Sequence, residues 1–363
     1  MESASVKGFA DFLRVGEYHT IPYFCSMKSS VRTVLVIIIA ALGLAACGGK
    51  NSGQTTAPKP SGDPAIEQLT QKILANPGDP TLYAARAGLF YEKEGYDEAI
   101  ADLEKALSID STNITYLHVL SDVYLDYYQS RKALITIEKA VAYHPEHIPS
   151  LLKLSEMQLI VRQYEASMRT IDRILRLDPQ NADAYLLFGM NFKEKGDTIR
   201  AINSFQKSVE LNPDLIDSWI NLGQLHAAIG SKMASRFFDN AILIAPKNVE
   251  ALHAKADYLQ DQNDLTGAIA LYKQIVLIDP QYEEAYFNAG LLYLDLDSIP
   301  EAFRQFDLAI KVNPVFVPGY YYRGIAAEIS GNIAQARANY EQALRLAPDF
   351  VEAQEALRQL SNQ

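Results

Sequence analysis

The chain has little cysteine and no excess of basic residues. Cys25 and Cys47 are its only cysteines, so a disulfide framework and a structural zinc site built on cysteine pairs or quartets are excluded. Its 33 lysine and arginine residues are outnumbered by 44 aspartate and glutamate residues, which gives a formal net charge of −11. Nucleic acid and anionic lipid surfaces both require a basic footprint, so we expect neither as the main partner.

The sequence motifs of common catalytic sites are also missing. There is no HExxH, no GxSxG and no glycine-rich phosphate-binding loop. His144 and His147 lie close together in an HPEH segment, but a metal site there would need further ligands from elsewhere in the fold, so we favour a solvated loop. We therefore expect no enzyme activity, no cofactor, no bound metal and no small-molecule substrate.

Long hydrophobic runs are limited to one segment near the N-terminus. Residues 34–46 are uncharged and almost wholly apolar, and Lys28 and Arg32 precede them. A membrane-spanning helix needs about 20 apolar residues, whereas a basic start followed by a shorter apolar run is typical of a secretory signal peptide. We interpret residues 27–46 as that signal peptide.

Two segments flank the signal peptide. Residues 1–26 have no signal character of their own. Either translation starts at Met27, which we favour and which makes them a spurious extension, or Met1 begins an unusually long N-terminal region. Residues 47–64 are rich in glycine, serine, threonine and proline and lack hydrophobic periodicity, so we expect a flexible tether.

The end of the apolar run resembles the lipobox of bacterial lipoproteins. It consists of Leu44, Ala45, Ala46 and Cys47. In that family a peptidase cuts before the cysteine, whose thiol carries a diacylglycerol, so the resemblance implies lipidation of Cys47 and attachment to a membrane. Gly48 stands where an aspartate tends to retain such proteins in the inner membrane, and no acidic surface-export signal follows. The resemblance therefore implies the periplasmic face of an outer membrane; a plain signal peptide with an incidental cysteine is the alternative.

The remainder of the chain is repetitive. Seven prolines, at positions 145, 179, 213, 246, 280, 314 and 348, are spaced by 33 or 34 residues, which predicts a repeat architecture. In this frame eight units span residues 80–350, and the fifth is one residue short between Gly230 and Ala234. Positions 8 and 20 of each unit are always small, whereas positions 4 and 24 are large and apolar. Small residues opposite bulky ones allow two helices to pack closely.

This pattern resembles the tetratricopeptide repeat (TPR) family over residues 80–350. The resemblance implies an all-α fold, a right-handed superhelical α-solenoid of eight helix-turn-helix repeats. Residues 65–79 resemble a half-repeat that caps the N-terminal end, and the polar segment 351–363 resembles a capping helix at the C-terminal end. Asp264 is expected in an exposed turn, where substitution by alanine would be nearly neutral.

In this family, partners usually bind a concave groove lined by positions 2, 5, 6, 9, 12 and 13 of the first helices. One branch grips a terminal carboxylate, but here Asn221 and Asn288 lack the matching basic residues, so that clamp is not supported. We expect instead that two apolar groups form a protein-binding groove, and that nearby acidic residues favour a partner segment mixing apolar and basic residues. Packing of these side chains between neighbouring helices is the alternative. The two groups are Leu152, Leu159, Leu186 and Met190 in repeats three and four, and Phe287, Leu291, Leu294, Tyr321, Tyr322 and Ile325 in repeats seven and eight.

These features together predict a non-enzymatic, lipid-anchored TPR scaffold that binds protein or peptide partners in the bacterial cell envelope. The alternative is a structural subunit of an envelope secretion, pilus or motility apparatus. A scaffold should purify as a free monomer or dimer, whereas an apparatus subunit should cofractionate in a large complex.

Overall fold

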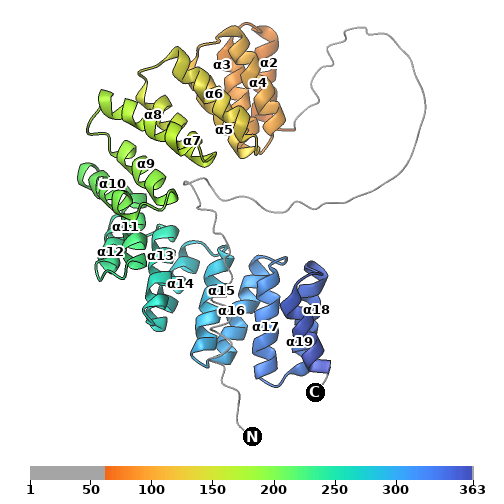
Figure 1. Cartoon of the computed structure of the whole chain (residues 1–363). Helices are drawn as coiled ribbons and strands as arrows, with labels where there is room; N and C mark the ends of the chain where they lie inside the picture. Colours follow the sequence, from red (N-terminus) through yellow and green to blue (C-terminus); the bar gives the residue numbers. More distant parts are fainter. Residues whose placement is uncertain (1–61, 362–363) are drawn as a thin grey trace, which may run out of the picture. The chain divides into compact units, whose positions relative to one another are not determined.

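The computed structural model describes residues 62–361, and this part of the chain consists of 18 helices without a strand (Figure 1). Each helix packs mainly against the helix before it and the helix after it in the sequence. The fold is therefore the expected TPR-type α-solenoid. In Figure 1 the helices follow one another in chain order from α2 to α19.

Eight helix pairs make up the repeats, and their lengths are very regular. Each first helix has 13 residues and each second helix has 14, except that α12 has 11, because the fifth repeat is shortened where its two helices meet. The first helices are α3 (Pro80–Glu92), α5 (Ile114–Asp126), α7 (Ile148–Ile160), α9 (Ala182–Glu194), α11 (Ile216–Ala228), α13 (Val249–Asp261), α15 (Glu283–Asp295) and α17 (Val317–Ile329). The second helices are α4 (Tyr96–Ile109), α6 (Ser130–Tyr143), α8 (Tyr164–Leu177), α10 (Thr198–Leu211), α12 (Ala234–Ile244), α14 (Leu265–Ile278), α16 (Ile299–Val312) and α18 (Ile333–Leu346).

One helix lies at each end of the eight pairs. Helix α2 (Pro64–Ala75) precedes the first repeat and packs against α3, and Asp63 caps its N-terminus by accepting hydrogen bonds from two backbone N–H groups. Helix α19 (Val351–Ser361) follows the last repeat and packs against α18. It buries Ala353 and Leu360 and leaves polar side chains toward solvent, so it covers the apolar end of the last pair.

The two helices of each pair approach closely at positions 8 and 24, as the small and bulky columns predict. A Cβ atom added to Gly189 would lie 2.6 Å from the ring of Phe205, and one added to Gly290 would lie 2.6 Å from the ring of Phe306. Real Cβ atoms do not approach other heavy atoms that closely, so the rings of Phe205 and Phe306 as placed leave room only for glycine, whereas Tyr272 in the sixth repeat is accommodated opposite Ala256.

The turn within each pair has the same backbone conformation in all eight repeats. Position 15 has a positive φ, between 53° and 76°, and the N–H of position 16 donates to the carbonyl oxygen of position 11 at 2.7–2.9 Å. This is the hydrogen-bond pattern of a Schellman motif, which ends a helix by a left-handed residue. Only three of the eight residues at position 15 are glycine. In order along the chain, the eight residues are Glu94, Tyr128, Arg162, Gly196, Gly230, Asn263, Asp297 and Gly331.

The prolines of the repeat frame lie in the turns between pairs, where aromatic side chains at position 4 fasten them. The indole N–H of Trp219 donates to the carbonyl oxygen of Pro213 at 2.8 Å, and the hydroxyl of Tyr320 donates to that of Pro314 at 3.1 Å. Proline ends the second helix because it cannot donate a backbone hydrogen bond. The aromatic hydrogen bond then fixes the chain as it enters the next first helix.

The expectation that Asp264 is an indifferent turn residue is wrong. Asp264 is the N-cap of α14, and its carboxylate accepts a hydrogen bond from the backbone N–H of Gly267 at 2.9 Å. The carboxylate therefore satisfies one of the backbone donors that the first turn of a helix leaves unpaired.

Candidate functional site: the face of the first helices

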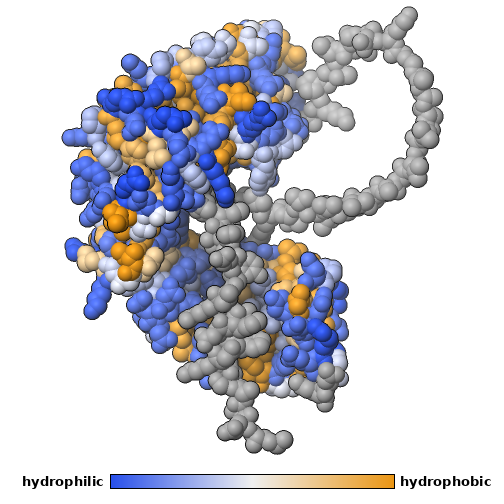
Figure 2. Space-filling model, viewed as in Figure 1, coloured by the Kyte–Doolittle hydropathy of each residue, from blue (hydrophilic) through white to orange (hydrophobic). Residues whose placement is uncertain are grey.

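The side chains at positions 2, 5, 6, 9, 12 and 13 of the eight first helices form what we call the first-helix face. Successive first helices contact each other most clearly in three pairs, which are α7 with α9, α11 with α13 and α15 with α17. Equivalent positions of the helices in these pairs are consequently brought alongside each other. Figure 2 shows one side of the molecule, where hydrophilic residues predominate and hydrophobic patches lie between them.

The predicted apolar group in repeats three and four is largely involved in packing. Leu159 of α7 is only 3% exposed. Leu152 and Met190 are half-buried and pack against the core of repeats one to four, and Leu186 and Met190 pack against the core of repeats four and five. The half-buried members retain some surface for a partner, whereas Leu159 has almost none.

The predicted apolar group in repeats seven and eight is joined into one aromatic cluster. The ring of Phe287 lies 5.1–5.8 Å, centroid to centroid, from the rings of Phe306, Phe316 and Tyr322. Tyr321 is 7% exposed and packs against Tyr322, Tyr340 and Phe350. These rings therefore hold adjacent repeats together, as the packing alternative expects.

Three other members of that group keep part of their surface accessible. Leu291 and Leu294 of α15 are half-buried and pack against Phe306, and Ile325 of α17 is half-buried beside Tyr340. Their place in a binding groove stays a prediction, and it falls on the aliphatic members rather than on the aromatic ones.

A row of carboxylates at position 2 was not singled out from the sequence. Asp217, Glu250 and Glu284 are the second residues of α11, α13 and α15, and all three reach solvent. None forms a salt bridge within residues 62–361. The signal in the sequence is the recurrence of an acidic residue at one repeat position in neighbouring units.

Neighbouring helices displace water around these carboxylates. This burial raises the pKa of Asp217, and it raises the pKa of Glu250, to which the negative charge of Asp217 adds. The pKa of Glu284 is raised by burial and, to a smaller extent, by the charge of Glu283. Each ionised carboxylate is therefore less stable here than it would be in water.

The lysine closest to this row is bound to neutral groups. The ammonium group of Lys193, at position 12 of α9, donates to Asn221 Oδ1 at 2.6 Å and to Gln224 Oε1 at 2.9 Å. Burial lowers the pKa of Lys193. The ammonium group is thus hydrogen-bonded to two neutral side-chain amides, and it forms no salt bridge with a carboxylate of the row.

A polar network next to the row joins repeats six and seven. His253 Nδ1 lies 2.7 Å from the hydroxyl of Tyr282, and its Nε2 lies 3.2 Å from Nδ2 of Asn288. The hydroxyl of Tyr272 donates to Asp257 Oδ1 at 2.7 Å. These hydrogen bonds hold the side chains of His253 and Asn288 in place on the first-helix face.

Two histidines share a buried serine between repeats two and three. His118 Nε2 lies 2.7 Å from Oγ of Ser150, and His147 Nδ1 lies 2.9 Å from the same oxygen. Burial, together with the nearby charges of Lys153 and His147, lowers the pKa of His118 to about 4. His147 also caps α7, and Nε2 of His144 lies 2.9 Å from the carbonyl oxygen of Thr112.

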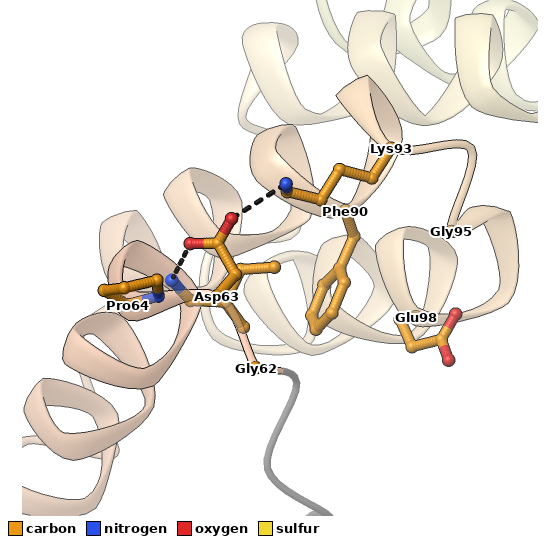
Figure 3. Close-up of a pocket in the computed structure, with 8 residues that line it drawn as sticks. Gly62, Asp63, Pro64, Phe90, Lys93, Gly95 and Glu98 are labelled. Atoms are coloured by element: carbon orange, nitrogen blue, oxygen red, sulfur yellow. Dashed lines mark hydrogen bonds and ion pairs between the residues drawn. The ribbon is translucent and has the colours of Figure 1, made fainter.

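A shallow pocket lies where α2, α3 and the turn before α4 meet (Figure 3). Asp63 forms an ion pair with Lys93 at 2.8 Å, and Phe90 and Glu98 also line the pocket. The bond from Lys93 and the backbone bonds at the N-terminus of α2 lower the pKa of Asp63. These contacts attach helix α2 to the first repeat, so we explain the residues of this pocket by their structural role.

Between residues 62 and 361, no three histidine, cysteine, aspartate or glutamate side chains are arranged to hold a metal ion. Over the same span, no helix is both long and apolar enough to cross a membrane. The predicted extension 1–26, signal peptide 27–46, lipidation site Cys47 and most of the tether 47–64 lie outside the described residues.

Comparison with known proteins identifies the repeats. Family models of the tetratricopeptide repeat match residues 80–113, 182–215, 253–315 and 317–350. Each match begins or ends close to the boundaries of the helix pairs described above.

Two characterised relatives match parts of the chain. The BBSome complex member BBS4 of Bos taurus is 27% identical over 108 residues, which are 30% of this chain and 21% of the relative. Superkiller protein 3 of Saccharomyces cerevisiae is 28% identical over 92 residues, which are 25% of this chain and 6% of the relative. The chain thus spans about a fifth or less of the length of these relatives.

A solved structure agrees with the fold over most of the chain. The crystal structure of the APC/C hetero-tetramer Cut9-Hcn1 superimposes with a TM-score of 0.51 and 17% sequence identity, over 82% of this chain and 58% of that one. The family models therefore show tetratricopeptide repeats over the residues that they match, and the superposition agrees with the same fold over most of the chain.

Proposed function

We propose that this protein is a non-enzymatic, lipid-anchored scaffold that binds protein or peptide partners at the periplasmic face of a bacterial outer membrane. The observation that carries the proposal is the combination, in one chain, of a signal-type segment ending at Cys47 and an array of eight TPR pairs. The first supplies attachment, and the second supplies a long surface for recognition.

Protein binding is supported by the chemistry of the first-helix face. It presents half-buried aliphatic side chains and exposed carboxylates on rigid helices, which suits a partner with complementary apolar and basic groups. The similarity of one segment to a protein named as a BBSome complex member is consistent with a role in protein assembly.

Membrane attachment is supported by the residues around Cys47. The small residues Ala45 and Ala46 precede the thiol, and an uncharged run with a basic start precedes them. A single acyl chain binds a membrane only marginally, so stable anchoring requires at least two chains on the mature N-terminus.

The anchor is tested by expressing Cys47→Ser and Cys25→Ser forms in a Gram-negative bacterium. We expect the unaltered protein and Cys25→Ser in the outer-membrane fraction, with lipid on Cys47 detected by mass spectrometry of the N-terminal peptide. Cys47→Ser should be released or left unprocessed. Unaltered protein that is soluble, with an intact N-terminus upstream of residue 47, would refute the lipoprotein proposal.

The scaffold role is tested by the size of the native particle. After gentle detergent extraction, a scaffold should migrate as a monomer or dimer to which partners can be cross-linked. Constant cofractionation with a large complex would instead favour the alternative of a secretion, pilus or motility subunit.

A further inference from the structure

The net charge of the protein is concentrated on the first-helix face. Its six positions in eight repeats hold 13 acidic residues and only two basic ones, Lys153 and Lys193. The whole chain has 44 acidic and 33 basic residues, so 31 of each remain elsewhere. The face therefore accounts for all of the net charge of −11, and the rest of the chain is neutral on balance.

Neither lysine forms a salt bridge with the position-2 carboxylates in the middle of this face. Lys153 is paired with Asp122 on the neighbouring helix, and Lys193 is bound to the amides of Asn221 and Gln224. Across repeats five to seven the carboxylates at position 2 make no salt bridge with any described residue. A cationic partner could reach them without breaking an ion pair.

The arrangement of the carboxylates suits a chain of cations better than a single ion. Asp217, Glu250 and Glu284 lie on three successive helices, one on each, and the described residues contain no convergent set of metal ligands. Half-buried aliphatic side chains lie on the first helices at both ends of this stretch: Met190 is at position 9 of α9, and Leu291 is at position 9 of α15. An extended segment crossing these helices would meet apolar, acidic and again apolar surface.

We propose that repeats four to seven bind an extended protein segment carrying several lysine or arginine residues, whose cationic groups lie against Asp217, Glu250 and Glu284. Apolar side chains of the same segment contact Met190 at one end and Leu291 at the other. This inference rests on the proposed function, that partners bind the first-helix face, and it specifies the chemistry of the segment recognised.

The same carboxylates should contribute little to the stability of the free protein. Burial raises their pKa values, which makes ionisation less favourable in the folded state, but each also lies in the first turn of a helix, where a negative charge is favourable. Neutral amides at these positions should therefore change the stability of the unbound protein only slightly while they weaken binding. A purely structural role for the carboxylates would lower stability without a specific loss of binding.

The test compares two triple variants with the same change in charge. The face variant is Asp217→Asn with Glu250→Gln and Glu284→Gln. The control variant is Glu138→Gln with Asp172→Asn and Glu341→Gln, three exposed acidic residues on the second helices α6, α8 and α18. The probe is a fluorescent peptide in which lysine and leucine alternate, and its partner probe has glutamine in place of every lysine.

Binding of both probes to the full chain is measured by fluorescence anisotropy, and thermal unfolding is measured for each protein. We expect the lysine probe to bind the face variant about tenfold or more weakly than the unaltered chain, with an affinity that falls as salt rises. The control variant should bind it within about twofold of the unaltered chain, and the glutamine probe should bind none of them appreciably. Equal losses in both variants or no loss in either would overturn the inference, and so would a loss of binding that unfolding of the face variant accounts for.

A parallel cross-linking experiment in cells separates this inference from the proposed function. If the unaltered chain captures partners and the face variant captures the same ones equally well, the scaffold role stands and the basic-segment inference falls. If the unaltered chain captures no partner while the probe binds in a face-dependent way, the inference about the face stands and the scaffold role falls.

Discussion

Gly223 and Phe238 are in contact so close that the glycine cannot gain a side chain. A Cβ atom on Gly223 would lie 2.5 Å from Cε1 of the Phe238 ring, and Phe238 is only 1% exposed. The ring is enclosed by protein, so a Cβ atom on Gly223 would have to displace it, and the contact sets how closely α11 and α12 approach each other.

We therefore expect Gly223→Ala to destabilise the protein by about 1–3 kcal/mol through overpacking. The matched control is Gly88→Ala, which is the same change in a first helix where a Cβ would meet no atom within 4 Å. That variant should be stabilised by about 0.5–1 kcal/mol, because alanine loses less backbone conformational entropy than glycine when the helix forms. Urea unfolding monitored by circular dichroism measures both; equal effects would show that the ring can move.

The left-handed turn residues give a prediction of the opposite sign. Tyr128 has a φ of 57° and is 86% exposed, so its side chain contributes little packing to compensate for an unfavourable backbone conformation. The left-handed region costs a residue with a Cβ atom roughly 1–2 kcal/mol, and glycine carries an entropic cost of about 0.5–1 kcal/mol. Tyr128→Gly should therefore raise the free energy of unfolding by up to about 1 kcal/mol.

The reverse change in the last repeat is the control for that prediction. Gly331 has a φ of 76° and an open environment, so Gly331→Ala introduces strain without a steric clash. We expect it to lower the free energy of unfolding by about 1 kcal/mol. If both variants change stability in the same direction, the turn conformation does not govern the effect.

The cap at α14 can be tested in the same way. Asp264→Ala removes the acceptor for the backbone N–H of Gly267 and should cost about 1 kcal/mol. Asp172→Ala, in the exposed middle of α8, should lie within about 0.5 kcal/mol of neutral. An Asp264→Ala protein as stable as the Asp172→Ala protein would show that solvent replaces the cap.

The sequence predicts the fold well because the same residue types recur at the same positions of eight units, so a pattern that is ambiguous in one unit is clear from all of them. Every unit has a small residue at the position of Gly223 and a bulky apolar one at the position of Phe238, so their contact could be anticipated. The left-handed turn could not, because Glu94, Tyr128 and Arg162 occupy a position that glycine would normally mark. The repeated hydrogen bonds of the turn impose that conformation regardless of the residue.

The candidate site was harder to predict, because hydrophobicity does not tell which side of a helix contact a side chain occupies. Tyr321 and Ile325 stand four residues apart on α17, yet Tyr321 is almost fully buried between helices and Ile325 is half-buried. Tyr321 is buried because the rings of Tyr340 and Phe350, which lie outside α17, pack against it, and the sequence of α17 alone does not show this. The charge of the same face is readable from the sequence, but only after the first-helix positions are counted separately from the rest.

His118 supplies the last prediction, which concerns pH. Its folded-state pKa, about 4, is below the value of about 6.5 for an exposed histidine, so the unfolded chain takes up a proton at a higher pH than the folded chain does. The stability that neutral His118 contributes is therefore present above about pH 6.5 and is lost as pH falls from there toward 4.

His118→Gln can keep a hydrogen bond to Ser150 but does not titrate. The difference in unfolding free energy between the unaltered protein and this variant should be constant above about pH 7 and should shift in favour of the variant between about pH 6.5 and 4. Urea unfolding across this range, with the difference between the two proteins taken at each pH, cancels the titration of the carboxylates that they share. A difference that does not change with pH would mean that His118 is protonated equally readily in the folded and the unfolded chain.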